Sequence, residues 1–275
     1  MFNHPKIIVG AHDGITAKLV ERHGFDGVWA SGFEISASYG VPDASIVTMT
    51  QLLERTMEMC DAVSLPIIAD CDTGFGNVNN AIHMVKKYEQ AGVSGICIED
   101  KLFPKVNSYI AGRQPLARID EFVGKLEAMV KNRNKIKIIA RTEALIANMG
   151  IEEALKRGEA YIGAGADAIL IHSKSRSYDE IYEFAELWNK RAPLVIVPTS
   201  YPEISISDIA KLGVVMVIFA NVCMRASVKA INDALLELSK SDNLYSIDRN
   251  LCAMGEIFEL QGMDEFKETE ENYLK

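Results

Sequence analysis

Short apolar runs recur at regular intervals along the whole chain, and amphipathic helical patterns separate them. Such alternation of buried strands and helices is typical of a parallel sheet. Eight repeats within 275 residues fit a closed (β/α)8 barrel of the TIM type better than an open doubly wound sheet. The expected strands are residues 6–9, 27–31, 65–70, 95–99, 136–141, 168–172, 194–198 and 214–220.

The helical patterns fill the intervals between these runs and continue after the last one. No linker or low-complexity stretch divides the chain, so we expect one barrel domain over residues 1–275. The expected helices are residues 15–23, 48–62, 77–91, 119–131, 151–164, 177–190, 205–211 and 222–239.

A further amphipathic helix is expected beyond the eighth repeat, over residues 249–260, with Leu251, Met254, Ile257 and Phe258 on one face. A barrel needs no ninth helix. We therefore expect a helical extension, about residues 240–262, that packs on a partner subunit or covers the base of the barrel. The charged tail from Gly262 is expected to fray.

The charge of the chain limits the partners it can have. A formal net charge of −9 and a pI near 5.2 argue against a broad surface for nucleic acid or anionic membrane, while a local positive pocket could still bind an anionic substrate. We find neither a secretory leader pattern nor an apolar run long enough to span a membrane. The five scattered cysteines contain no CxxC pair and are typical of reduced thiols. We expect a cytoplasmic protein.

Acidic residues stand where two neighbouring strands end. Asp70 and Asp72 close the third run and share one face, because residues two apart in a strand point the same way. Glu99 ends the next run. Carboxylates gathered in this way repel one another unless a cation lies between them, and all-oxygen ligands suit Mg²⁺ or Mn²⁺. The alternative is that they are solvated loop acids that cap the following helix.

Polar residues follow seven of the eight expected strands, which themselves are almost wholly apolar. Arg141 ends the fifth strand and should be partly buried, so it needs an anionic partner. That partner is either Glu143, in a structural ion pair, or a phosphoryl or carboxylate group of a ligand. His172, after the sixth strand, is either a core histidine or part of the same site. Residues 102–114 form either a lid over the mouth or an ordinary solvent loop.

One decapeptide places these residues in a known family. Residues 99–108 read EDKLFPKVNS, which is similar to the EDKxFPKxNS signature of phosphoenolpyruvate mutase, a member of the isocitrate lyase superfamily. The resemblance covers almost the whole chain and weakens after about residue 240. It also includes residues 29–32, 70–77, 140–144 and 165–174.

The resemblance implies a fold, an assembly and a reaction. It implies a (β/α)8 barrel whose last helix is exchanged between subunits in a dimer of dimers. It also implies an isomerase of phosphonate biosynthesis that converts phosphoenolpyruvate to phosphonopyruvate with Mg²⁺, or with Mn²⁺ as the alternative. By this resemblance the metal ligands are Asp72 directly and Asp43, Asp70 and Glu99 through water.

The resemblance also assigns the substrate contacts. The pyruvyl oxygens would meet the backbone near Ser31, Gly32 and Phe33, beside Trp29. The phosphoryl group would be held by Arg141, His172, Asn107 and Ser108. The implied catalytic residues are Asp43, Lys101, Asn107, Arg141 and His172.

Relatives with other chemistry remain alternatives. Isocitrate and methylisocitrate lyases carry a cysteine in a K-K/R-C-G-H loop after the fourth strand, and residues 101–105 contain none. That difference argues against a carbon–carbon bond lyase of this kind. Phosphonopyruvate hydrolase is nearer, but resembles a version of the signature with Thr where this chain has Asn107. A non-enzymatic scaffold would require some acids or the lid to be missing.

Overall fold

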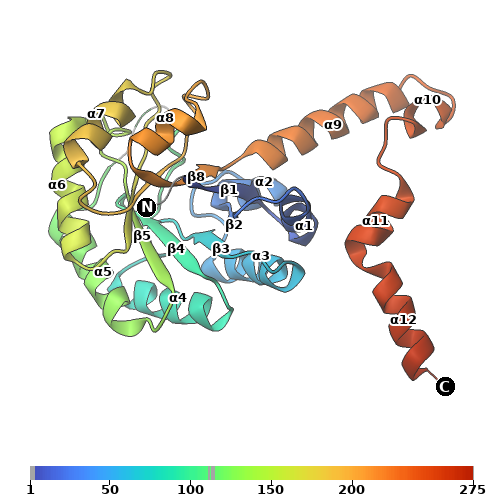
Figure 1. The fold of residues 1–275 in the computed structure, drawn as a ribbon, viewed down its shortest axis with the longest axis horizontal. Helices are drawn as coiled ribbons and strands as arrows, with labels where there is room; N and C mark the ends of the chain where they lie inside the picture. The colour runs from blue at the N-terminus through green and yellow to red at the C-terminus, as the bar shows by residue number, and fades with distance from the viewer. Residues whose placement is uncertain (1–3, 111, 113–114, 275) are drawn as a thin grey trace. The chain divides into compact units, whose positions relative to one another are not determined.

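The computed structural model describes residues 4–110, 112 and 115–274. Eight parallel strands follow one another in sequence order around a closed barrel, and the eighth pairs with the first (Figure 1). The predicted (β/α)8 fold is therefore confirmed. The strands are β1 (Lys6–Ala11), β2 (Gly27–Ala30), β3 (Ile67–Asp70), β4 (Gly95–Glu99), β5 (Lys137–Thr142), β6 (Ala168–Ile171), β7 (Leu194–Ile196) and β8 (Val214–Phe219).

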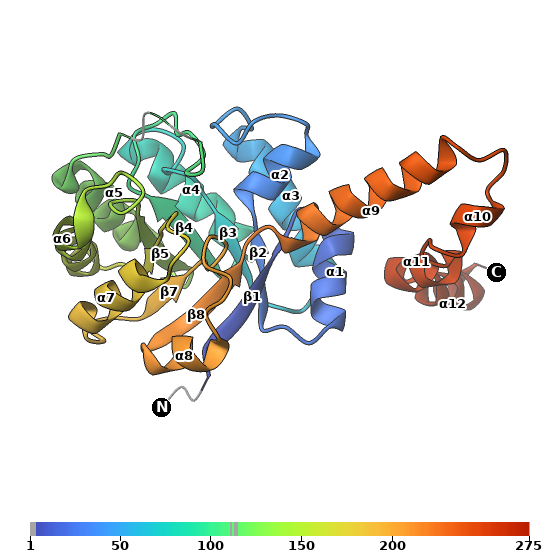
Figure 2. The ribbon, with the colours of Figure 1, turned by 90° about the horizontal axis from the view of Figure 1, so that it is seen from above.

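The strands read as apolar runs in the sequence because both of their faces are covered. Every residue of β2, β4 and β6 is buried, as expected where side chains fill the barrel on one side and helices pack on the other. Helices lie around the outside of the strands (Figure 2). The barrel interior is filled by a cluster made of Ile8, Trp29, Ile68, Cys97, Ile139, Ala168, Leu170, Val195, Val197 and Ile218.

The barrel helices match the predicted ones within a few residues, with one addition. Helix α2 (Gly32–Ser38) lies in what the sequence presented as a long connection. Ser31 caps it, since its Oγ accepts a hydrogen bond from Glu34 N at 3.3 Å. The other helices of this part are α1 (Gly14–Arg22), α3 (Met49–Ala62), α4 (Val78–Gln90), α5 (Ile119–Asn132), α6 (Gly150–Gly163), α7 (Asp179–Trp188) and α8 (Ile206–Lys211).

The chain divides into two compact units, residues 1–222 and residues 223–275. The helices after the barrel are α9 (Val222–Leu238), α10 (Tyr245–Asp248), α11 (Met254–Gln261) and α12 (Met263–Tyr273). Of the helices in the described part of the chain, none is long and apolar enough to cross a membrane.

Two expectations for the C-terminal segment were wrong. The tail after Gly262 is helical rather than frayed, because Gly262 takes a left-handed conformation (φ 73°) that ends α11 and starts α12. The helix predicted from residue 249 begins only at Met254, so Leu251 lies outside it.

Substitution of Gly158 on α6 tests how closely α6 and α7 pack outside the barrel. A Cβ atom at this position would lie 2.9 Å from Cζ3 of Trp188, which is buried on α7 and stacks on Phe184. We expect Gly158→Ala to lower the free energy of unfolding by about 1–3 kcal/mol through overpacking. Gly124→Ala on α5 is the matched control, because a Cβ there meets nothing within 4 Å. It should stabilise by about 0.5–1 kcal/mol through helix propensity. Urea unfolding of the two variants measures this, and changes of the same sign would contradict the packing described.

Candidate active site at the carboxyl ends of the strands

The predicted acids lie at the mouth of the barrel. Asp70 ends β3, and its Oδ1 accepts a hydrogen bond from Asp72 N at 3.4 Å. A Cβ at Gly32 would lie 3.2 Å from Asp70 Oδ2, so the first residue of α2 makes room for this carboxylate. Asp72 has a left-handed backbone conformation with φ 49°. Such conformations are unfavourable for a side chain with a Cβ and are concentrated at functional sites.

A lysine that the sequence analysis gave no role lies between two of these acids. Lys105 Nζ is 2.7 Å from Asp43 Oδ1 and 3.0 Å from Asp72 Oδ1, and only 5% of Lys105 is exposed. Its backbone N–H donates to Ser45 Oγ at 3.1 Å. Lys105 is part of the EDKLFPKVNS segment, so its position in that signature was the one signal that could have found it.

Burial and charge set the protonation of these acids. Burial raises the pKa of Asp70 to about 7, and the negative charge of Asp72 adds to this while Lys105 opposes it. Burial likewise raises the pKa of Asp72. For Asp43, burial acts in the same direction but is outweighed by the charge of Lys105 and by hydrogen bonds, so the pKa of this carboxyl is lowered. The three acids together can therefore carry more negative charge than the single positive charge of Lys105 compensates.

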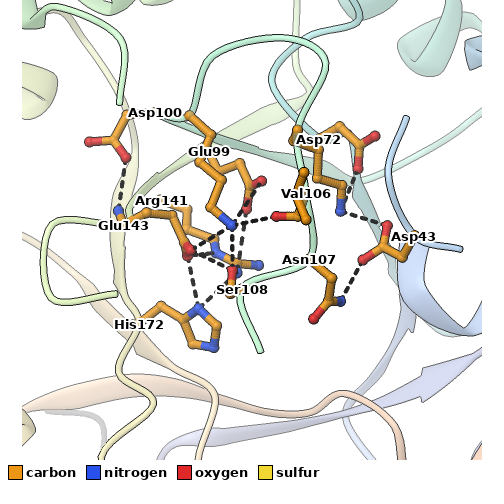
Figure 3. Close-up of polar contacts among 12 residues, drawn as sticks. Asp43, Asp72, Glu99, Asp100, Val106, Asn107, Ser108, Arg141, Glu143 and His172 are labelled. Atoms are coloured by element: carbon orange, nitrogen blue, oxygen red, sulfur yellow. Dashed lines mark hydrogen bonds and ion pairs between the residues drawn. The ribbon is translucent and has the colours of Figure 1, made fainter. Parts of the chain in front are cut away.

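A second cluster surrounds Arg141 at the end of β5 (Figure 3). Arg141 Nε donates to Glu143 Oε1 at 2.6 Å, and Nη2 donates to Ser108 Oγ at 3.2 Å. Nη2 also lies 2.8 Å from His172 Nδ1, which is itself 2.8 Å from Glu143 Oε1. The contact between Arg141 and Glu143, one of the two alternatives for this arginine, is therefore present, and it is part of a larger group.

Glu143 is the centre of this group, although the sequence offered it only as a partner of Arg141. Its Oε2 accepts from Ser108 Oγ at 2.5 Å and lies 3.1 Å from Lys101 Nζ. Burial works against ionisation, but the charges of Arg141 and Lys101 outweigh it and hold the pKa of Glu143 well below its usual range. Burial and the nearby guanidinium lower the pKa of His172, which favours a neutral imidazole.

The segment predicted as a lid joins the two clusters. Asn107 Nδ2 donates to Asp43 Oδ2 at 2.7 Å, while the next residue, Ser108, contacts Arg141 and Glu143. Lys101 Nζ donates to Val106 O at 2.9 Å and to Ser108 Oγ at 2.7 Å. Residues 102–110 thus cross the mouth between the acids and the arginine (Figure 3). The end of the predicted lid includes residues 111, 113 and 114, which lie outside the described residues.

The remaining predicted residues lie around these clusters. Trp29 is 2% exposed and belongs to the cluster that fills the barrel. Ser31, Gly32 and Phe33 form the N-cap and first turn of α2, whose backbone N–H groups have no acceptor within the helix itself. Glu99 lies 3.4 Å from Arg141, between Oε2 and Nη2, so it reaches the second cluster from β4.

The carboxylate oxygens at the mouth are of the type that binds a divalent cation. Glu99 Oε1 is buried without a hydrogen-bond partner among the described residues, and its ion-pair contact with Lys101 Nζ spans 3.9 Å. Within residues 4–110, 112 and 115–274, no three His, Cys, Asp or Glu side chains converge in a metal-binding geometry. Asp43 and Asp72 instead share the ammonium of Lys105. Carboxylate oxygens that carry excess charge are nevertheless the ligands that Mg²⁺ prefers.

Fold and site together define a class of protein: a (β/α)8-barrel enzyme with buried acids and a partly buried guanidinium at the carboxyl ends of its strands. The chain belongs to the phosphoenolpyruvate phosphomutase family, whose model matches residues 3–239.

Relatives with two different activities are about equally similar to this chain. Phosphonopyruvate hydrolase of Variovorax sp. (strain Pal2) is 47% identical over 97% of this chain and 93% of its own length. Phosphoenolpyruvate phosphomutase of Tetrahymena pyriformis is 46% identical over 97% of this chain and 90% of its own.

Solved structures of proteins with both activities are also similar to this chain. A phosphoenolpyruvate phosphomutase from Streptomyces platensis subsp. rosaceus superposes with a TM-score of 0.97 at 47% identity, covering 98% of this chain and 95% of the other. A phosphonopyruvate hydrolase complex with oxalate and Mg²⁺ gives a TM-score of 0.94 at 45% identity, with 98% and 95% covered.

The raised pKa of Asp70 predicts how stability depends on pH. Between about pH 4 and pH 7 the folded chain keeps a proton on Asp70 that the unfolded chain has released, so the free energy of unfolding falls as the pH rises through this window. Asp70→Asn cannot ionise. We therefore expect it to raise Tm at about pH 8 by several degrees more than at about pH 4.5, at roughly 2–4 °C per kcal/mol.

The control for this prediction is Glu183→Gln, which changes an exposed acid on α7. Its effect on Tm should be small and nearly the same at the two pH values. Thermal unfolding followed by circular dichroism measures both variants. If Asp70→Asn shifted Tm equally at the two pH values, the folded carboxyl would ionise as an ordinary one.

Proposed function

We propose that this chain is a phosphoenolpyruvate mutase, an isomerase of phosphonate biosynthesis that interconverts phosphoenolpyruvate and phosphonopyruvate with Mg²⁺ or Mn²⁺. The observation that carries the proposal is the place of Asn107. Its amide lies on the lid between the acid cluster, around Asp72, and the arginine cluster, around Arg141. Asn107 Nδ2 donates to Asp43. The mutase signature has this amide, whereas the hydrolase resembles a version with Thr.

The second cluster is suited to hold the migrating phosphoryl group. Transfer through a loose, metaphosphate-like state needs positioning and charge stabilisation rather than covalent help from the protein. Arg141 supplies a planar fork of donors, and its partners Glu143 and Ser108 fix the plane of the guanidinium. A neutral His172 has one N–H, and when its Nδ1 accepts from Arg141 Nη2 that N–H is on Nε2, where it can donate to the phosphoryl group without adding charge. Ser108 and Asn107 approach from the lid side.

The first cluster and α2 are suited to the pyruvyl part of the substrate. The N–H groups of Gly32 and Phe33 in the first turn of α2 can donate to carboxylate or enolate oxygens above Trp29. We propose Asp72 as the direct metal ligand, with Asp43, Asp70 and Glu99 acting through water. Bound Mg²⁺ would neutralise negative charge on the substrate oxygens. Lys101 holds the lid backbone at Val106 O, and Lys105 holds Asp43 and Asp72.

The choice between mutase and hydrolase depends on water. A metaphosphate-like group next to water gives phosphate and pyruvate, whereas one that is shielded and oriented can be captured by carbon. Asn107 can donate to a phosphoryl oxygen and accept from a neighbour, and it fills more space than Thr does. Phosphonopyruvate hydrolase is the second candidate because the Variovorax enzyme is 47% identical. A carbon–carbon lyase of the same superfamily is less well supported, since residues 101–105 contain no cysteine.

We further propose that the enzyme is a cytoplasmic homo-oligomer, a dimer of dimers, and that its C-terminal helices provide the contacts. Helix α9 contains no buried residue, and Val228, Ile231 and Leu235 on it are each 59% exposed. These residues recur at the spacing of one helix face. An apolar face of this kind is stable in water when another surface covers it, and exchange of a helix with a neighbouring copy would cover it.

The mutase proposal predicts the products of the reaction and the effect of losing the lid amide. Phosphorus NMR of wild-type enzyme with Mg²⁺ and phosphonopyruvate should show phosphoenolpyruvate as the product. Asn107→Ala should lower this rate by a factor of roughly 10² or more, the scale of a lost transition-state hydrogen bond. Asn107→Thr should additionally release phosphate.

Asn189→Gly is the control for this test, because it removes an exposed amide just after α7 and glycine tolerates the left-handed backbone conformation at this position. It should leave the ratio of products unchanged. A wild-type enzyme that yields mainly phosphate and pyruvate would replace the mutase assignment by the hydrolase. Full isomerisation by Asn107→Ala would remove the lid amide from the mechanism.

The assembly proposal predicts the result of shortening the chain. A chain that ends at Asp248 lacks α11 and with it Ile257 and Phe258, so it should form monomers or aggregate. A chain that ends at Gln261 lacks only the highly charged α12, none of whose residues is buried, and should keep its oligomeric state. Light scattering after size-exclusion chromatography measures the masses. Equal, wild-type masses for both shortened chains would exclude α11 as an oligomer contact.

A further inference from the structure

Asp100 stands between two residues of the site but faces away from it. Successive residues at a strand end alternate in direction. Glu99 and Lys101 reach the arginine cluster, whereas Asp100 points away from it (Figure 3) and toward Arg157 and Tyr161 on α6. Its side chain is 0% exposed. Asp100 is thus a fully buried carboxylate outside the proposed substrate site. Burying a carboxylate costs free energy unless other groups pair with it.

Four donors satisfy this carboxylate. On the helix side, Asp100 Oδ2 accepts from Tyr161 OH at 2.7 Å and from Arg157 Nη1 at 3.0 Å, both on α6. On the strand side, Oδ2 accepts from Thr142 Oγ1 at 3.1 Å, and Oδ1 accepts from Glu143 N at 2.8 Å. The last bond is the important one, because it fixes the backbone of the residue at the centre of the arginine cluster.

The same group of residues also holds the end of the lid that returns to the barrel. Ala117 N donates to Asp100 O at 2.8 Å, and Ala117 O accepts from Arg157 Nη1 at 3.1 Å. Just before this point, Leu116 forms an isolated antiparallel bridge with Lys101. Arg157 therefore touches both the carboxylate that positions Glu143 and the backbone through which the lid rejoins the fold.

We propose that Asp100 and Arg157 are positioning residues of the reaction. They act through Glu143, whose backbone they fix relative to Arg141 and His172, and through Ala117, which fixes where the lid returns. This inference rests on the proposed function for the identity of the reaction. Among the described residues, no side-chain hydrogen bond or ion pair joins this pair to Asp43, Asp70 or Asp72, so we expect the pair to act mainly on the phosphoryl-binding side.

The test compares three variants. Asp100→Asn places an amide where three side-chain donors converge, so at least one donor loses its acceptor. We expect kcat to fall at least tenfold, with the KM for phosphonopyruvate and the Mg²⁺ concentration for half-maximal activity within about twofold of wild type. Tyr161→Phe removes one of the four hydrogen bonds to Asp100, together with the bond that Tyr161 OH accepts from Arg157 Nη1 at 3.1 Å. Arg157 keeps its bonds to Asp100 and Ala117, so this variant should fold normally and lower kcat by a smaller factor, about threefold.

Glu153→Gln is the matched control, because Glu153 accepts from Arg157 Nε at 2.9 Å without touching Asp100. It should keep wild-type kcat. Hydrogen exchange measured by mass spectrometry gives a readout that does not depend on activity. In the Asp100 and Tyr161 variants, exchange should rise in peptides that cover residues 115–118 and 141–145, and not in peptides from β7, β8 or α8.

The outcomes separate the two proposals. A wild-type enzyme that produces neither phosphoenolpyruvate nor phosphonopyruvate from the other overturns the proposed function, and the exchange experiment then decides the positioning role by itself. Unchanged kcat in Asp100→Asn and Tyr161→Phe overturns the positioning role. So does a uniform rise in exchange over the whole barrel, which would show that the group only stabilises the fold. If Asp100→Asn fails to fold, Tyr161→Phe carries both readouts.

Discussion

The structure depends on the burial of many charges in one small volume. Acids at the ends of β3, β4 and β5 and in the loop after α2 meet two lysines and an arginine beneath a single segment of chain. Each of these groups would be expensive to bury alone, and most are stable here because a neighbour of opposite sign lies within about 4 Å. The lid contributes Lys105, Asn107 and Ser108 to this arrangement. The position of the lid across the mouth and the burial of the acids therefore stabilise each other.

This dependence explains why the two clusters differ in protonation. The arginine cluster is balanced, and the pKa of Glu143 falls well below its usual range although burial opposes this. The acid cluster has too few cations, and burial raises the pKa values of Asp70 and Asp72. An excess of buried negative charge is what a divalent cation would relieve, and a balanced cluster around a guanidinium is what an incoming phosphoryl dianion would compete for.

Much of the fold and part of the site could be predicted from the sequence. A parallel strand covered on both faces appears as an apolar run, so all eight strands were found within a few residues. Helix α2 was missed although Ser31 and Glu34 stand three residues apart at its start, as in a capping box. Period-two alternation does not account for the pair Asp70 and Asp72, because β3 ends at Asp70 and Asp72 has a left-handed backbone conformation.

Contacts between loops could not be predicted in the same way. Lys105 and Glu143 each have partners far away in the sequence, and whether they meet depends on the path of the lid and on the packing of α6. The resemblance to a known family reached the acids, Asn107, Arg141 and His172, but left Lys105 and Glu143 without a role. A motif of adjacent letters also does not show that Asp100 faces the opposite way from Glu99 and Lys101.

The burial of the positively charged side chains affects how an anionic substrate would approach the site. Arg141, Lys101 and Lys105 are almost completely shielded from solvent, so a distant anion experiences mainly the net charge of −9. Under the proposed function, a phosphorylated carboxylate would therefore be repelled at long range and attracted only once it has entered the mouth of the barrel. Dissolved salt screens the long-range repulsion over a Debye length of about 8–10 Å but hardly weakens contacts with buried groups. Capture of substrate should then become faster as ionic strength rises from low values, the reverse of the behaviour of enzymes that steer anions with an exposed basic surface.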